Sequence, residues 1–195
     1  MSKNNVDFLT LNEPNITDFA KARNKLLNRS NAEWVFFVDS DEKITSELMS
    51  EVKKITDKGP SLADGYVVRR KIYFLGKYIG KDKVLRLAKR GSSRWVRPVH
   101  EVWDVKTRVR PLQNYLVHNT ASNLYDYIEK INKYAKLHAE ANKEEGKKSN
   151  LFKILFYPNL KFYQSMIMGR GTVFSIMQSF HSFLAWSELW LSQRN

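Results

Sequence analysis

Three carboxylates stand within four positions of one another, at Asp39, Asp41 and Glu42, directly after the apolar run Trp34–Val38. Carboxylates this close repel one another unless a cation or a proton lies between them. Hard divalent ions such as Mg²⁺ prefer oxygen ligands and often join one or two carboxylates to the phosphates of a substrate. The spacing therefore indicates a metal–diphosphate site. A polar turn that caps the next helix explains the same residues equally well.

The elements around these carboxylates are those of an α/β protein. The run Trp34–Val38 is short, uniformly apolar and rich in β-formers, which predicts a central strand covered on both faces. Open α/β sheets place their ligands at the carboxyl ends of such strands. A helix is predicted over Asp18–Asn28, with Thr17 or Asp18 as its cap, and a second helix begins at Thr45.

A β-rich middle follows. Strands are predicted over Gly65–Phe74 and Lys83–Lys89, with Gly76 and Gly80 bracketing a turn between them. Further short strands are expected through Trp95, 102–105 and 115–118.

The last third of the chain is predicted to be helical. A long helix over 121–145 ends at Gly146, and two aromatic segments follow at 151–168 and 172–191. The last segment is long enough to span a bilayer, but polar side chains interrupt it. Lysines and Arg170 flank or lie within both segments, a pattern typical of the membrane interface. We favour peripheral attachment over spanning, although packing on the domain or on a partner subunit fits equally well.

Charge and composition limit the function classes. The 195 residues carry a net charge of +13, and the segment 64–110 holds fourteen Lys and Arg against four Asp and Glu. Such a segment attracts nucleotide diphosphates, anionic lipids or nucleic acid, but no nucleic-acid-binding motif accompanies it. The chain has no cysteine, which excludes disulfides, thiolate catalysis and thiolate-bound zinc. The first residues have no apolar run of signal-peptide length, so nothing there indicates export.

Five segments occur in order along the chain: Asp18–Asn24, Glu33–Glu42, Arg86-Leu87, Val99-His100-Glu101 and Leu116-Val117-His118. Together they resemble family 2 glycosyltransferases of the GT-A fold. The resemblance is closest to the branch that includes lipopolysaccharide-core and other cell-envelope glycosyltransferases, and it covers roughly Asp18 to His138. It implies a partial GT-A domain with a Rossmann-like sheet over 1–120, a long helix over 121–146 and C-terminal helices over 147–195.

The resemblance also implies a metal site. In this family an Asp-X-Asp pattern holds a divalent metal, Mg²⁺ or Mn²⁺, on the diphosphate of a nucleotide-sugar donor. Here that pattern is Asp39-Ser40-Asp41, with Asp41 the stronger candidate for direct coordination. His100 or His118 would complete the metal or diphosphate shell, and the resemblance does not choose between them.

The remaining implied roles concern donor contact and proton transfer. Arg23 and Asn24 are candidates for contacts to the nucleotide or its phosphates, because the Ala-Arg-Asn element lies near the donor in this family. Glu101 would be the catalytic base that removes a proton from the acceptor hydroxyl. Arg86, in the basic segment, is a further candidate for phosphate contact, although a single arginine is more often a surface charge.

One departure from the family concerns the amino-terminal part. Family members begin with βα units that bind the nucleotide base, and Met1–Thr17 could supply at most one strand. We therefore expect the strand Trp34–Val38 to lack neighbours and to expose an edge, so that the isolated chain is poorly stable or self-associates.

The function expected is metal-dependent, inverting transfer of a sugar from a nucleotide-sugar donor to a cell-envelope glycan or lipid-linked acceptor. The expected location is the cytoplasm, peripheral at the inner face of the cell membrane, with no nucleic acid as partner. The alternative is a non-catalytic basic module that binds anionic lipid or nucleic acid. Steep dependence of binding on salt, without dependence on metal or nucleotide, would distinguish that module.

Overall fold

The computed structural model describes residues 5–12, 16–57, 63–97 and 101–194. The chain divides into two compact units, the first made of 1–72 and 81–119 and the second of 73–80 and 120–195. Together they give a mixed α/β protein with a curled mixed sheet and C-terminal helices, consistent with a partial Rossmann-like fold.

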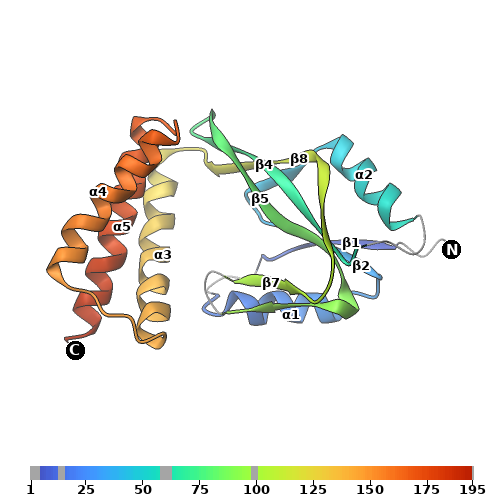
Figure 1. Ribbon diagram of the computed structural model, residues 1–195, viewed down its shortest axis with the longest axis horizontal. Helices are drawn as coiled ribbons and strands as arrows, with labels where there is room; N and C mark the ends of the chain where they lie inside the picture. Colours follow the sequence, from blue (N-terminus) through green and yellow to red (C-terminus); the bar gives the residue numbers. More distant parts are fainter. Residues whose placement is uncertain (1–4, 13–15, 58–62, 98–100, 195) are drawn as a thin grey trace. The chain divides into compact units, whose positions relative to one another are not determined.

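The first unit is built on a six-stranded mixed sheet (Figure 1). Its strands lie in the order β1-β2-β5-β4-β8-β3, with β1 parallel to β2, and with the pairs β2–β5 and β3–β8 antiparallel. A separate two-stranded sheet pairs β6 with β7. The bounds are β1 Val6–Thr10, β2 Trp34–Val38, β3 Glu42–Ile44, β4 Gly65–Phe74, β5 Lys77–Lys89, β6 Ser93–Val96, β7 Val102–Val105 and β8 Val109–Ala121.

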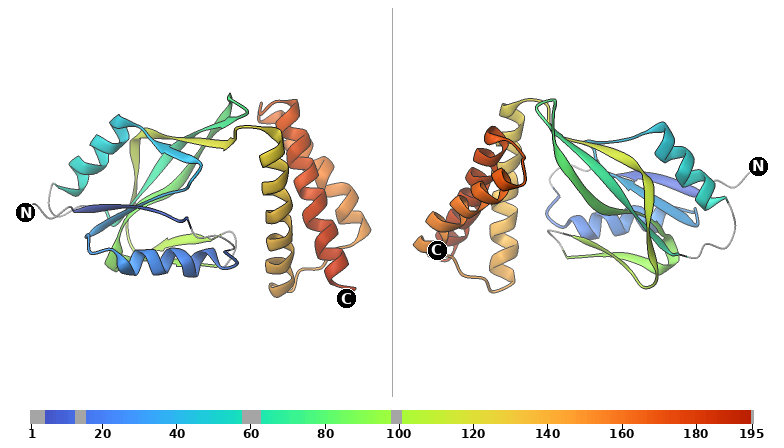
Figure 2. Two further views of the ribbon diagram at one scale, coloured as in Figure 1. Left: turned by 180° about the vertical axis from the view of Figure 1, so that it is seen from behind. Right: turned by 45° about the horizontal axis from the view of Figure 1, so that its top comes forward.

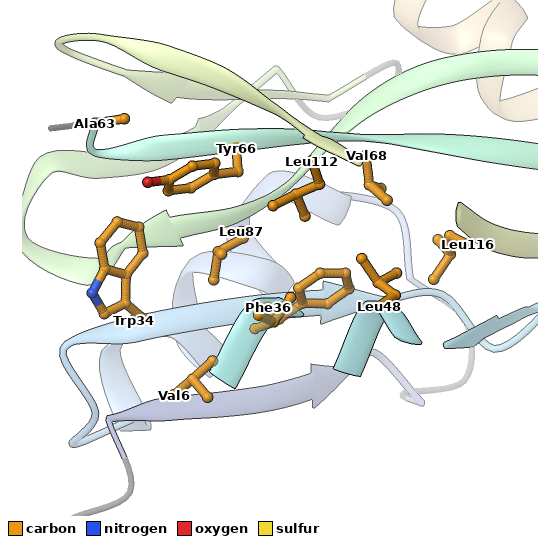
Figure 3. Packing of buried hydrophobic residues seen from close by; sticks show 11 residues of the cluster. Val6, Trp34, Phe36, Leu48, Ala63, Tyr66, Val68, Leu87, Leu112 and Leu116 are labelled. Atoms are coloured by element: carbon orange, nitrogen blue, oxygen red, sulfur yellow. The ribbon is translucent and has the colours of Figure 1, made fainter. Parts of the chain in front are cut away.

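Strand β2 is covered on both faces, as its composition predicts. Trp34 and Phe36 pack toward α2 (Ser46–Thr56), where Phe36 lies beside Leu48 (Figure 3). The alternate residues Val35 and Phe37 pack toward α1 (Phe19–Arg29) and the β6–β7 pair. Because successive side chains of a strand point to opposite faces, one five-residue strand contributes to two cores.

The expectation of an exposed edge at β2 is wrong. Strand β1 pairs with β2 in parallel along its whole length, from Val6 opposite Trp34 to Thr10 opposite Val38, and β5 pairs on the other side. Phe36 and Phe37 have no exposed surface. The single strand that the amino-terminal residues can form is therefore enough to cover this edge.

Local signals in the sequence determine where several elements begin. Asp18 accepts a hydrogen bond from the Lys21 amide, and Thr45 accepts one from the Leu48 amide, so each caps its predicted helix. The turn between β4 and β5 consists of Leu75 and Gly76, both with positive φ, the backbone that two-residue hairpin turns require. Gly80, predicted in that turn, lies inside β5.

The second unit contains three helices, α3 Leu124–Glu144, α4 Leu151–Ile167 and α5 Thr172–Ser192 (Figure 2). Asn123 and Asn150 cap α3 and α4 through their side-chain oxygens. Helix α5 packs against both other helices. Within the described part of the chain, no helix has the combined length and apolar character needed to cross a bilayer.

Candidate active site

The acidic residues lie in a tight turn between β2 and β3. The Glu42 amide donates to the Asp39 carbonyl at 2.9 Å, and the Asp39 amide donates to Glu42 Oε2 at 3.1 Å. These two bonds fold the turn back on itself directly after the buried strand. The carboxylates are therefore held at the carboxyl end of β2, as the sequence predicts.

Arg23 joins this turn to Glu101. Its Nη2 donates to Asp39 Oδ1 at 2.6 Å and its Nε donates to Glu101 Oε1 at 3.1 Å. The Arg23 side chain is only 6% exposed, and its guanidinium lies 4.6 Å from the ring centroid of Trp95. Helix α1 thus contributes one buried cation that contacts both the acidic turn and the predicted base.

Two further arginines, Arg86 and Arg70, pair with Asp39 and Glu42 of the turn. Arg86 of β5 donates through Nη2 to Asp39 Oδ2 and, at 2.6 Å, to Glu42 Oε1. Arg70 of β4 also donates to Glu42 Oε1, at 2.8 Å, and forms a two-bond pair with Asp82. The Glu42 side chain has no exposed surface. A buried carboxylate of this kind is stable only because both guanidiniums reach it.

Charge pairing controls the protonation state of the cluster. Burial by itself raises the pKa of the Asp39 carboxyl, but the charges of Arg86 and Arg23 outweigh burial and hold that pKa below its ordinary value of 3.8. For Arg70, burial lowers the pKa, but Asp82 and Glu42 raise it well above its ordinary value. Asp39 is therefore a carboxylate and Arg70 a cation at neutral pH.

Asp41 points to a different neighbour, His118 of β8. Strand β3 pairs with β8 so that Glu42 is opposite His118, and the Asn119 amide donates to the Asp41 carbonyl at 2.8 Å. This register brings Asp41 Oδ1 within 3.4 Å of His118 Nδ1. His118 Nδ1 is buried and makes no hydrogen bond among the described residues. Two potential metal ligands thus lie side by side.

The Asn24 side chain is engaged in hydrogen bonds within the protein. Its Nδ2 donates to the Trp95 carbonyl at 2.8 Å and its Oδ1 accepts from the Trp95 amide at 2.9 Å. Both polar atoms of the side chain therefore hold β6 against α1. The ring of Trp95 stacks on the ring of Trp103 with 5.1 Å between the ring centroids, and Phe37 contacts both rings edge-on. The donor contact predicted for Asn24 stays a prediction.

Six of the eight predicted site residues lie in or beside one ion-pair network. Arg23, Asp39, Arg86 and Glu101 come together in one ion-pair network, and Asp41 lies with His118 beside it. His100 lies outside the described residues. No three His, Asp or Glu side chains gather into a metal-binding group anywhere in the described ranges.

Arg70 and Asp82 belong to the ion-pair network, but the sequence pattern does not identify them as site residues, and it gives Glu42 no role of its own. Strand β4 carries the signal that could have identified Arg70, because alternation places it on the buried side with Val68 and Ile72. A charged residue at an inward-facing strand position requires a buried partner. That partner, Glu42, could not be named without the turn geometry.

Comparison with curated proteins shows similarity to a glycosyltransferase. The chain is similar to the "Lipopolysaccharide core biosynthesis glycosyltransferase LpsC" of Rhizobium meliloti (strain 1021), with 26% identity over 152 residues. The aligned region covers 74% of this chain and 56% of the relative, so the chain spans about half the length of the curated protein it matches. No family model matches the chain.

Proposed function

We propose that this chain carries the catalytic part of a metal-dependent, inverting glycosyltransferase of family 2 with the GT-A fold. It would transfer a sugar from a nucleotide-sugar donor to a cell-envelope glycan or lipid-linked acceptor. The observation that carries the proposal is the single guanidinium of Arg23, which contacts both Asp39 and Glu101. The similarity to a lipopolysaccharide core glycosyltransferase supports the sugar-transfer class.

Glu101 is the proposed base. In the reaction, the acceptor hydroxyl oxygen forms a bond to the anomeric carbon, the bond from that carbon to the diphosphate breaks, and the hydroxyl proton passes to Glu101. Inversion needs only this one base on the face opposite the leaving group. Arg23 holds Glu101 through Oε1 at 3.1 Å, so we assign the proton-accepting role to Oε2.

The acidic turn would bind the leaving diphosphate. Asp39 already has both oxygens on guanidiniums, Oδ1 on Arg23 and Oδ2 on Arg86, so it suits a positioning role. Asp41 and His118 fit direct metal ligation better, because their 3.4 Å separation is close to that of adjacent ligands on one ion. A bound divalent ion would stabilise the charge that develops on the diphosphate. Two protein ligands are enough when phosphates and water complete the shell.

The test is a transfer assay with the full chain, divalent metal, a panel of nucleotide sugars and lipopolysaccharide-core or lipid-linked acceptors. Glu101→Gln keeps the shape and the hydrogen bond from Arg23 but removes the basic oxygen. We expect it to lower the transfer rate by about 10²-fold or more with donor binding unchanged. Asp104→Asn, an exposed carboxylate on β7, is the matched control. Full activity of Glu101→Gln would exclude its role as base.

The alternative of a non-catalytic basic module gains no support from the cluster. Arg70 and Arg86 of the basic region are directed to carboxylates, as is Arg23 of α1, so these cations are already neutralised. A binding module needs no such buried network. The remaining surface cations explain attraction to anions in general but not the arrangement around Asp39.

A further inference from the structure

Helix α4 presents an apolar face that its own unit does not cover. Only Ile154, Pro158 and Ser165 of this helix are buried. The opposite side carries large apolar side chains at helical spacing, with exposed fractions from 39% for Met166 to 86% for Ile167. We call this set the α4 face; it comprises Leu151, Phe152, Leu155, Phe156, Leu160, Tyr163, Met166 and Ile167.

This exposure is specific to the second unit. In the described part of the first unit, only Val102 and Val109 are large hydrophobic residues with comparable exposure. Scattered exposed hydrophobics are normal, but a continuous stripe on one helix marks an interaction surface. Phe152 and Phe156 stack on each other at 5.1 Å, so two of the aromatic rings already form one platform.

The segment of the chain that contains the α4 face is basic. No Asp or Glu occurs from Gly146 to Ser187, whereas five cations do: Lys147, Lys148, Lys153, Lys161 and Arg170. Lys147 and Lys148, which directly precede α4, are exposed. A protein partner that buried the α4 face would need carboxylates on the partner's surface to pair with these cations. An anionic bilayer supplies both an apolar interior and a layer of negative head groups.

We propose that the α4 face is a membrane-docking surface that lies in the head-group region of an anionic lipid bilayer. The apolar side chains would enter the acyl boundary, and Lys147 and Lys148, just before the helix begins, would contact lipid phosphates. The helix lies along the surface in this arrangement and does not cross it. The inference stands on the second unit alone and does not depend on the transfer chemistry.

The experiment measures partition of the full chain into lipid vesicles by flotation. Vesicles of phosphatidylcholine with about one third phosphatidylglycerol are compared with pure phosphatidylcholine at low salt. We expect binding to the anionic vesicles that weakens as salt rises. Phe152→Ser with Phe156→Ser should reduce the partition coefficient about tenfold or more, because both rings leave the acyl boundary. Absence of binding to anionic vesicles would overturn the proposal.

Two matched variants and one further measurement test the surface itself. Tyr125→Ser with Ile128→Ser removes two exposed apolar residues of α3 in the same unit and should leave partition unchanged. Lys147→Glu with Lys148→Glu should weaken anionic binding more than Lys21→Glu with Lys54→Glu, which has the same net charge. Equal effects within either pair would contradict the assignment. Light scattering that shows a stable dimer lost in the Phe152, Phe156 variant would make a second copy the occupant and overturn it too.

Discussion

Asp39 and Glu101 contact the same guanidinium, that of Arg23, although they lie on different elements and far apart in the sequence. Asp39 directly follows β2, and Glu101 precedes β7. Arg23 comes from α1 and is 94% buried at its side chain, with 6% exposed. One helix residue therefore fixes the distance between the acidic turn and the proposed base.

Removal of Arg23 is expected to destabilise the first unit. Arg23→Ala would leave Asp39 with only Arg86 and Glu101 without its cation, and loss of one partner from a buried ion pair costs about 3 kcal/mol of unfolding free energy or more. Urea unfolding followed by circular dichroism measures this. Arg29→Ala, an exposed arginine of the same helix, is the control and should change stability by less than about 0.5 kcal/mol. Equal stability of both variants would mean that the ion pairs of Arg23 do not contribute to the unfolding free energy.

The stability of the protein should depend on the protonation of Asp39 at acidic pH. The pKa of this carboxyl in the folded state is below its ordinary value of 3.8, so in acid the unfolded state binds the proton first. The stabilisation is thus present above about pH 4 and is lost as pH falls through the folded-state pKa. Unfolding free energy measured from pH 5 to pH 2.5 should fall more steeply in the wild type than in Asp39→Asn. Parallel curves would show that Asp39 is not the group responsible.

Asn24 offers a test of structural against donor-binding function. Asn24→Ala removes both hydrogen bonds to the Trp95 backbone and leaves those buried groups unpaired, at a cost of about 1–3 kcal/mol. Asn28→Ala, exposed on the same helix, should be close to neutral. If Asn24→Ala were as stable as Asn28→Ala but bound nucleotide sugar less tightly, the residue would be a ligand contact and not a clamp on β6.

The Asp41–His118 pair predicts where a divalent ion binds. Asp41→Asn should weaken Mn²⁺ binding in the presence of nucleotide diphosphate by about tenfold or more, as measured by calorimetry or by the electron paramagnetic resonance signal of free Mn²⁺. His118→Ala should act in the same direction. Asp104→Asn serves as the control, because Asp104 is an exposed carboxylate of β7 outside the ion-pair network. Unchanged Mn²⁺ binding in both Asp41→Asn and His118→Ala would remove the metal assignment.

Much of the local structure could be predicted because short-range signals determine it. The strand Trp34–Val38 and the strand Gly65–Phe74 have the predicted bounds, and Asp18 and Thr45 cap their helices. Each depends on neighbouring side chains: apolar continuity for the strands, and a side-chain oxygen near free amides for the caps. Gly80 shows the limit, since a glycine near a hairpin suggests a turn whether or not the strand continues through it.

The sequence by itself determined the chemical inventory of this protein: a carboxylate-rich turn after a buried strand, a basic central region and an acid-free aromatic carboxyl-terminal segment. Only the tertiary structure decided which charges meet. Arg23, Arg70 and Arg86 come from three different elements, and nothing in their spacing assigns them to Asp39, Glu42 and Glu101. The physical reason is that burial makes each ion pair depend on a close, long-range contact, whereas strands and helix caps depend on residues a few positions away.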